Sequence, residues 1–90
     1  MEVIKLKDDL FYIGDLDNPK AYIKIERDED NDIKVVSTFV DDSLRGKGIA
    51  GKLTEEVISY AKKERLKIVP ICPYTINFFE KHEGYHGLLK

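Results

Sequence analysis

The stretch VDDSLRGKGIAGKL, residues 40–53, places three glycines and three basic side chains between an apolar run and an amphipathic one. Gly46, Gly48 and Gly51 fit the dinucleotide fingerprint GxGxxG, and residues 46–52 fit all but the last letter of the P-loop GxxxxGK[ST]. In both patterns glycine lets backbone N–H groups approach an anion, and the positive end of a helix dipole stabilises its charge. The stretch therefore predicts a phosphate site, with a glycine-rich turn that merely starts a helix as the alternative.

A third phosphate pattern uses the same letters, because Arg45, Gly48 and Ala50 spell RxxGxA, a form of the acyl-CoA pyrophosphate loop. The P-loop pattern fails at Leu53, since Ser or Thr is needed there to bind Mg²⁺. The dinucleotide pattern requires an acidic residue about 20 positions further on, where residues 71–73 are Ile, Cys and Pro. These departures argue against the P-loop and the dinucleotide patterns, so the acyl-CoA pattern is favoured.

The flanks of this stretch predict a strand, a helix and another strand. Residues 33–40 are rich in β-branched side chains, which favour a strand, and residues 66–71 form a second short apolar run. Between them, apolar residues recur at four-residue spacing and predict an amphipathic helix over residues 49–64. A parallel crossover of this kind places the glycine loop at the carboxyl end of the first strand, where ligands bind in open sheets.

The N-terminal half alternates in a way that predicts antiparallel strands over residues 2–6, 11–13 and 21–26. The acidic residues 27–32 then read as a hairpin turn. Asp28, Asp30 and Asp32 have the first spacings of a calcium loop, but its glycine and final glutamate are missing, so a solvated turn is predicted. Residues 75–81 predict a short helix that packs through Ile76, Phe78 and Phe79, and residues 83–90 have no clear period.

The composition bounds what the chain can be. Ninety residues suffice for one domain, predicted over residues 1–90, and 42% apolar with 36% charged residues is typical of a soluble globular protein. The formal net charge of -2 argues against a nucleic-acid partner. Neither a spanning helix nor a signal peptide is evident, so a cytoplasmic location without a membrane partner is expected. The single cysteine, Cys72, has no partner for an internal disulfide.

Two stretches resemble a known family. STFVDDSLRGKGIAGKLTEEVISYAKK, from Ser37, resembles motif A of the GCN5-related N-acetyltransferases, and KIVPICPYTINFFEKHEGY, from Lys67, is similar to short stand-alone acetyltransferase-like proteins with a strand, CPY or CPF, and a helix. Together they cover more than half of the chain. The resemblance implies an α+β fold with an α/β-like core: antiparallel N-terminal strands, a strand-loop-helix-strand unit that binds CoA, and a short C-terminal helix.

The resemblance also implies a site for acetyl-CoA or CoA as cosubstrate. The backbone of residues 46–51 would hold the pyrophosphate, basic side chains would add charge, and the free edge of the strand over residues 37–40 would receive the pantetheine arm. Pro70 agrees with an open side of the next strand, because proline donates no ladder hydrogen bond. The predicted cofactor-binding residues are Phe39, Val40, Arg45, Gly46, Lys47, Gly48, Ile49, Ala50, Gly51, Lys52 and Asn77.

The predicted catalytic residues are Cys72 and Tyr74. The stretch FFEK resembles FYEK of larger relatives, in which tyrosine often serves as the acid, but Phe79 stands in that place. Cys72 would then protonate the leaving thiolate or accept the acetyl group itself, with an inert buried cysteine as the alternative. Tyr74 would align or protonate, or simply pack. His82 and Tyr85 are expected to lie on the surface or to pack near the end of the last helix, and no metal site is predicted.

Two functions from different classes remain open at this point. The first is an acetyl-CoA-dependent N-acetyltransferase whose acceptor is a small-molecule amine or a protein amine. The second is a CoA-binding or regulatory module with the same fold and no turnover, which the short chain and Phe79 favour. Because the substrate walls of larger relatives are missing, the site is expected to be open or to be completed by a partner or a second copy.

Overall fold

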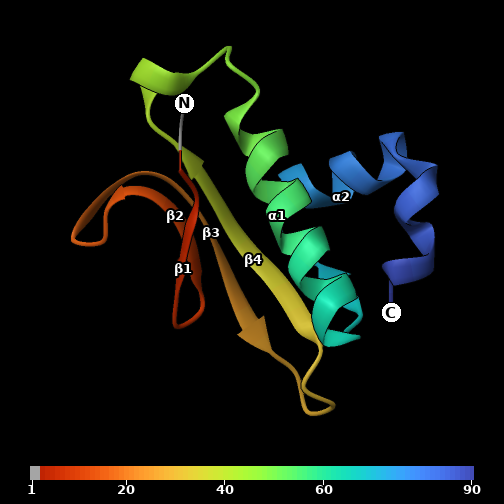
Figure 1. The fold of residues 1–90 in the computed structure, drawn as a ribbon. Helices are drawn as coiled ribbons and strands as arrows, with labels where there is room; N and C mark the ends of the chain where they lie inside the picture. The colour runs from red at the N-terminus through yellow and green to blue at the C-terminus, as the bar shows by residue number, and fades with distance from the viewer. Residues whose placement is uncertain (1–2) are drawn as a thin grey trace.

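The computed structural model describes residues 3–90, with strands in the first half and mainly helices in the second (Figure 1). The fold is α+β, as predicted, and within residues 3–90 no helix has the length and apolar character needed to cross a membrane. In chain order the elements are β1 (Lys5–Lys7), β2 (Leu10–Asp15), β3 (Asn18–Arg27), β4 (Ile33–Val40), the 3₁₀ helix η1 (Asp42–Leu44), α1 (Ile49–Glu64), β5 (Ile68–Pro70), α2 (Pro73–Lys81) and the 3₁₀ helix η2 (Glu83–Leu88).

The five strands form one sheet whose spatial order, β1-β2-β3-β4-β5, is also the order of the chain. The first four strands pair antiparallel with their neighbours, and β5 pairs parallel with β4 after the crossover through α1. Figure 1 shows α1 running along β4 on one side of the sheet, with α2 beyond it. The loop between β4 and α1 therefore lies at the carboxyl end of β4, as the sequence predicts.

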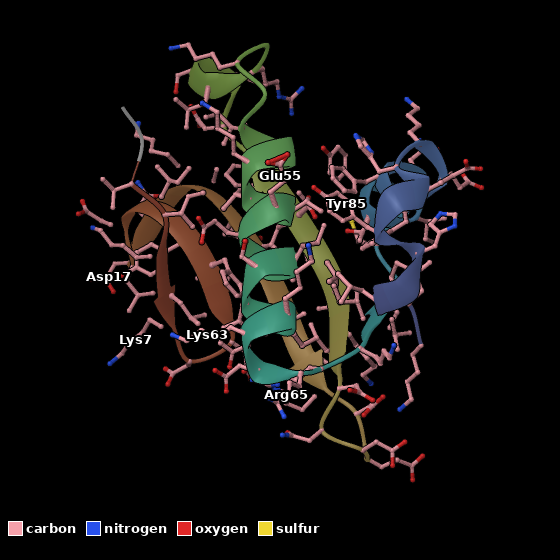
Figure 2. The ribbon with its side chains drawn as sticks, turned by 45° about the vertical axis from the view of Figure 1, so that its right-hand side comes forward. Lys7, Asp17, Glu55, Lys63, Arg65 and Tyr85 are labelled. Carbon is pink, nitrogen blue, oxygen red and sulfur yellow. The ribbon has the colours of Figure 1, made fainter. Side chains whose placement is uncertain are left out.

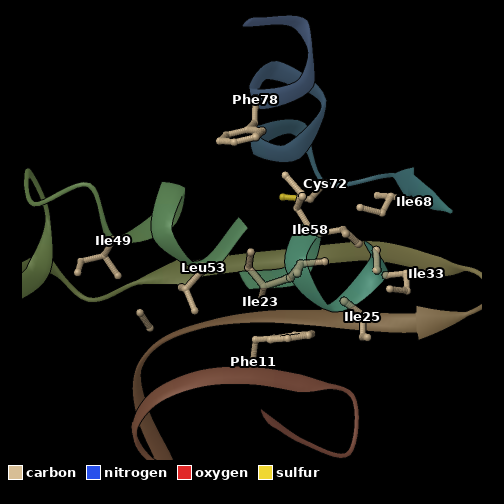
Figure 3. Packing of buried hydrophobic residues seen from close by; sticks show 14 of the residues in the cluster. Phe11, Ile23, Ile25, Ile33, Ile49, Leu53, Ile58, Ile68, Cys72 and Phe78 are labelled. Atoms are coloured by element: carbon tan, nitrogen blue, oxygen red, sulfur yellow. The ribbon is translucent and has the colours of Figure 1, made fainter. Parts of the chain in front are cut away.

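The core lies between α1 and the sheet. On β3, Ala21, Ile23 and Ile25 alternate with exposed or half-buried residues and turn toward α1, as the strand period of two requires. From α1, Leu53 and Val57 meet them at the four-residue spacing predicted for the helix. Figure 3 shows this packing, with Ile23 and Ile25 facing Leu53 and Ile58 across the core.

A bulge in β4 separates the part that pairs with β5 from the part that pairs only with β3. In the register with β3, Ile25 pairs with Val35 and Lys24 pairs with Ser37, so Val36 is left as the extra residue. On its other side, β4 pairs with β5 only from Ile33 to Val35. A bulge bends its strand and increases the local twist. Residues 37–40, called here the free edge of β4, therefore leave the ladder with β5.

The end of β5 explains why the ladder stops. Pro70 pairs with Val35 as the last residue of β5 and has no N–H to continue the hydrogen-bond pattern. Immediately after it, the N–H groups of Ile71 and Cys72 both donate to the carbonyl oxygen of Val35, at 3.0 and 2.9 Å. The chain then turns into α2, so the predicted open side of this strand is present at Pro70.

Most of the predicted elements are present. The strand over residues 33–40 and the helix over residues 49–64 are confirmed with their bounds, and the hairpin turn is confirmed between β3 and β4. The prediction of a first strand over residues 2–6 is wrong in its bounds, since β1 is Lys5–Lys7. Glu2 lies outside the described residues. Packing by Ile76 is wrong, because its side chain is 43% exposed, and residues 83–88 form a 3₁₀ helix that the sequence pattern did not indicate.

The acidic turn holds a lysine ammonium. The Nζ atom of Lys90 lies 2.6, 2.8 and 3.3 Å from carboxylate oxygens of Asp28, Asp30 and Asp32. The second oxygen of Asp28 accepts hydrogen bonds from the backbone N–H groups of Asp30 and Asp32, both at 2.9 Å. The hydrogen bond from Lys90 is the main reason why the pKa of Asp28 lies below its ordinary value, and the same contact raises the pKa of Lys90.

We predict that Lys90→Met lowers the melting temperature by a few degrees at neutral pH. Because the folded pKa of Asp28 is lowered, the stabilisation is complete above its ordinary value of about 3.9 and is lost as the pH falls through the lower folded value. On the alkaline side it is lost as the pH rises beyond about 10.4, since the folded pKa of Lys90 is raised. Thermal melts of both proteins against pH test this, with Lys63→Met as the exposed control (Figure 2). An equal difference at pH 2 and pH 7 would contradict it.

Candidate functional site

The glycine loop between β4 and α1 is anchored at one end and open at the other. Leu44 of η1 is buried in the core, and the side chain of Asp41 accepts a hydrogen bond from the N–H of Ser43 at 3.0 Å. Beyond that anchor, Gly46 and Gly48 have φ angles of +80° and +71°, a region that L side chains adopt only at a cost. A Cβ at either glycine would have no heavy atom within 4 Å, so this stretch of backbone faces open space.

The first turn of α1 leaves its N–H groups available to an anion. Gly48 is the N-cap, and no side chain caps the helix there. The first turn carries no acidic residue, so the positive end of the dipole of this 16-residue helix is not neutralised by the helix itself. Arg45, Lys47 and Lys52 are exposed around it, and Arg45 pairs with Asp42 at 3.0 Å. The arrangement suits a phosphate or another anion.

One hollow lies along the glycine loop and a second lies over α2, and Tyr74 lines both. The first, of about 280 Å³, is lined by Val40, Leu44, Arg45, Gly46, Gly48, Ile49, Ala50, Gly51 and Tyr74. The second, also about 280 Å³, is lined by Tyr74, Asn77, Phe78, Lys81 and His82. Because Tyr74 lines both, an elongated ligand could lie along the loop and continue over α2 past this ring.

Tyr74 has a polar end in a half-enclosed position. Its side chain is 38% exposed, and its hydroxyl oxygen would lie 3.8 Å from a Cβ built on Gly51. Burial raises the pKa of the phenol, and the hydroxyl of Thr54 offsets part of that effect. Tyr74 is therefore neutral near pH 7 and has a proton to donate.

Cys72 lies where the free edge of β4 and the start of α2 approach each other. It is the N-cap residue of α2, it is 8% exposed, and its Sγ donates to Oγ1 of Thr38 at 3.5 Å. Burial acts to raise the pKa of the thiol, but the hydroxyl of Thr38 and the backbone N–H groups of Thr75 and Tyr74 together outweigh it. The pKa of Cys72 therefore lies below its ordinary value, the direction expected at a helix N-terminus.

The predicted cofactor-binding residues take four different positions. Asn77 lines the second hollow, and the residues that line the first hollow with Tyr74 are Val40, Arg45, Gly46, Gly48, Ile49, Ala50 and Gly51. The side chains of Lys47 and Lys52 are exposed near the loop without lining a hollow. Phe39 belongs to the free edge through its backbone, while its ring packs against that of Tyr22, with the centroids 5.4 Å apart and the planes tilted by 32°. Phe39 pairs with Tyr22 in the register, and Tyr22 alternates with core residues, so both rings lie on the sheet face opposite α1.

The histidines pack against α2, as expected for His82. The ring of His82 stacks on Phe78 at 4.1 Å, and its Nδ1 lies 2.7 Å from the carbonyl oxygen of Phe78. The Nε2 of His86 lies 2.6 Å from the carbonyl oxygen of Phe79. Tyr85 adds a third ring parallel to Phe78 and lies beneath the ammonium of Lys62 on the side of α1 (Figure 2). These contacts cap the last turn of α2 and hold η2 in place.

Sequence reasoning missed two hydroxyls beside Cys72. Thr75 follows Cys72 at the N-cap-plus-three spacing, which places a side chain next to the cap, so this one had a usable signal. Thr38 had none, because its approach to Cys72 depends on the bulge at Val36 and on the end of the ladder at Pro70.

Comparison with known proteins now bears on the whole chain. A family model described as GCN5-related N-acetyl-transferase matches residues 10–88. A search of curated proteins gives no significant match. Among solved structures, the chain is similar to the NMR solution structure of a GCN5-like protein from Staphylococcus aureus that is proposed to be an N-acetyltransferase. The two are 32% identical with a TM-score of 0.82, over 98% of this chain and 87% of the other. The chain belongs to the GCN5-related N-acetyltransferase family.

Proposed function

We propose that the protein transfers an acetyl group from acetyl-CoA to an amine. The observation that carries this proposal is the uncapped N-terminus of α1, which lies behind two glycines of positive φ and beside the free edge of β4. An anion-binding helix N-terminus beside a strand with one unpaired edge suits a ligand with a charged pyrophosphate and a long amide-bearing arm. Family membership supports acyl transfer in general, and the use of acetyl-CoA is part of the proposal.

In this proposal the backbone N–H groups of residues 46–51 bind the pyrophosphate, and Arg45, Lys47 and Lys52 add positive charge. The backbone of Phe39 and Val40, at the free edge, is available to hydrogen-bond the amides of the pantetheine arm. That edge leads back along β4 to Thr38 and Cys72. Asn77 and Tyr74 line the second hollow and would orient the ligand there.

Cys72 supports two chemical routes. In one, the Sγ thiolate attacks the thioester carbonyl, an Sγ–C bond forms, the C–S bond of CoA breaks, and CoA departs as a thiolate that takes a proton; the amine then displaces Cys72. In the other, the amine attacks the thioester directly and Cys72 or Tyr74 protonates the departing CoA thiolate. The lowered pKa of Cys72 favours the first route, and the neutral phenol of Tyr74 suits the second. The acceptor is proposed to be a small-molecule or protein amine, with neither nucleic acid nor membrane as a partner.

A CoA-binding module without turnover is the second candidate. Phe79, where larger relatives have a tyrosine acid, is 2% exposed and packs in the core against Phe78, with ring centroids 5.7 Å apart. Phenylalanine has no hydroxyl and so cannot act as an acid, and Phe79 does not line either hollow. Binding without catalysis therefore depends on Cys72 and Tyr74 being inert.

Thermal unfolding in the presence of acetyl-CoA, CoA, ATP and NAD tests the proposal. A ligand at 100 times its dissociation constant stabilises the fold by about 2.7 kcal/mol. For a domain of this size that corresponds to a rise of about 10–20 °C in the melting temperature. We expect the rise with acetyl-CoA and CoA and not with NAD. No shift with either CoA species would overturn both candidates, and equal shifts with ATP would indicate a general phosphate site.

Gly51→Ala is predicted to move stability and affinity in opposite directions. Alanine is favoured over glycine within a helix by about 0.5–1 kcal/mol, and the new Cβ makes an ordinary contact, 3.8 Å from the Tyr74 hydroxyl. The methyl group also narrows the first hollow, and we expect CoA affinity to fall roughly tenfold or more. Denaturant unfolding and calorimetric titration measure the two effects, with Gly84→Ala as the control outside both hollows. Unchanged affinity would place the ligand elsewhere.

A further inference from the structure

The hydroxyl of Thr75 is buried without a partner. Its residue is 0% exposed, and among the buried side-chain atoms of residues 3–90 its Oγ1 is the one that makes no hydrogen bond. Leaving such a group unsatisfied costs free energy, so its presence needs a physical explanation. Thr54, the other buried threonine, shows the ordinary solution, because its Oγ1 donates to the carbonyl oxygen of Ala50 at 2.8 Å.

The usual partner of a side chain in this position is taken. Thr75 is the third residue after the N-cap Cys72, from which a polar side chain commonly reaches back to the N–H of the N-cap. That N–H instead donates to the carbonyl oxygen of Val35 at 2.9 Å, as part of the junction that ends the β4–β5 ladder. The Thr75 hydroxyl is thereby left without a partner in the first turn of the helix that Cys72 caps, and it acts to lower the pKa of the Cys72 thiol.

A second hydroxyl approaches the same sulfur from β4. Thr38 lies just after the bulge at Val36, and its Oγ1 accepts from the Cys72 thiol at 3.5 Å. A thiol donates its one hydrogen to Thr38, and its neutral sulfur is only a weak acceptor for the hydroxyl of Thr75. A thiolate carries a full negative charge and accepts more strongly from both hydroxyls. The pair of hydroxyls therefore favours the ionised form of Cys72.

We infer that Thr38 and Thr75 are positioning residues that stabilise the thiolate form of Cys72, with its sulfur facing the free edge of β4. Ile58 and Phe78 belong to the same buried cluster as Cys72 (Figure 3), and the phenol of Tyr74 stays protonated. The stabilisation comes from hydroxyls and from backbone N–H groups in the first turn of α2. The use of the thiolate as acyl acceptor rests on the proposed function, while its stabilisation by the two hydroxyls does not.

The single cysteine makes the test direct, because every alkylation event reports on Cys72. Iodoacetamide reacts with the thiolate, so the pH at half-maximal rate gives the thiol pKa, while a change in access scales the rate at every pH. We expect Thr38→Val and Thr75→Val each to raise that midpoint by about one pH unit, which lowers the rate below the midpoint about tenfold. Thr38→Ser and Thr75→Ser keep the hydroxyl and should restore it. Thr54→Val is the matched control, because its buried hydroxyl donates to the carbonyl oxygen of Ala50 and not to Cys72.

The outcomes separate this inference from the proposed function. Unchanged midpoints in both valine variants, with melting temperatures showing that they fold, would overturn the inference even if CoA binds. Shifted midpoints without any CoA binding would support the role of the two threonines and would overturn the proposed function alone. Midpoints that shift equally in Thr54→Val would assign the effect to general loosening of the fold and would also overturn the inference.

Discussion

Cys72→Ser is expected to lower the rate of acetyl transfer by at least about 100-fold, the lower end of what a single acid, base or nucleophile contributes. A serine hydroxyl does not ionise near neutral pH, so it replaces neither a thiolate nucleophile nor an acid matched to the CoA thiol. The fold should survive, because Cys72 is an N-cap residue without a side-chain cap hydrogen bond, and serine is among the preferred N-caps. CoA affinity should stay unchanged, since Cys72 lies outside the glycine loop and lines neither hollow.

Steady-state kinetics with a panel of amines, alongside calorimetric titration of CoA, measures both quantities. Ile76→Ala is the matched control, because its side chain is exposed on the same helix and lines neither hollow. Unchanged turnover in Cys72→Ser would remove Cys72 from the mechanism. Absence of turnover in both proteins, with CoA still bound, would favour the binding module over the enzyme.

Leu53→Ala is expected to destabilise the fold by about 2–5 kcal/mol, the usual cost of truncating a buried leucine. Leu53 is 0% exposed and lies in the first turns of α1, between the glycine loop and the sheet. A domain of this length has a total stability of about 5–15 kcal/mol, so the loss would remove a large share of it. The melting temperature should fall by roughly 10–40 °C at 4–8 °C for each kcal/mol.

Circular dichroism during thermal and urea unfolding measures how much Leu53→Ala lowers the free energy of unfolding. The control is Glu55→Ala, two residues away on the exposed side of α1 (Figure 2), which should change stability by no more than about 0.5 kcal/mol. A loss below about 1 kcal/mol in Leu53→Ala would mean that α1 does not pack on the sheet as described.

Much of the fold could be predicted because local pattern and tertiary burial agree. The four-residue spacing from Ile49 to Ala61 predicted α1 with its bounds, and the alternation along residues 21–26 predicted the faces of β3. The acidic turn was predicted as solvated, but its pairing with Lys90 joins residues 62 positions apart, and no local pattern contains that information. The 3₁₀ helix η2 was missed for a similar reason, since His86 and Tyr85 hold it through contacts with α2 and α1.

One part of the candidate site could also be predicted from the sequence, and another part could not. Glycines, basic residues and a helix start all lie within residues 45–52, so the sequence alone predicted an anion loop. The surroundings of Cys72 depend on three separate segments: the bulge at Val36, the end of β5 at Pro70, and the first turn of α2. Because no single stretch of sequence encodes where these meet, Thr38 and Thr75 became visible only in three dimensions.

The strands lie in the sheet in the same order as in the chain, and this order affects how fast each pair of strands forms. Each of β1 to β4 finds its partner across a short connection, so these hairpins close with little loss of chain entropy. The pairing of β4 with β5 must instead close a loop over residues 41–67, the most demanding closure in the sheet. Folding should therefore run from a fast N-terminal meander to a slower crossover. The junction that carries Cys72 would form last, so a partly folded chain would have β1 to β4 paired before the surroundings of Cys72 are in place.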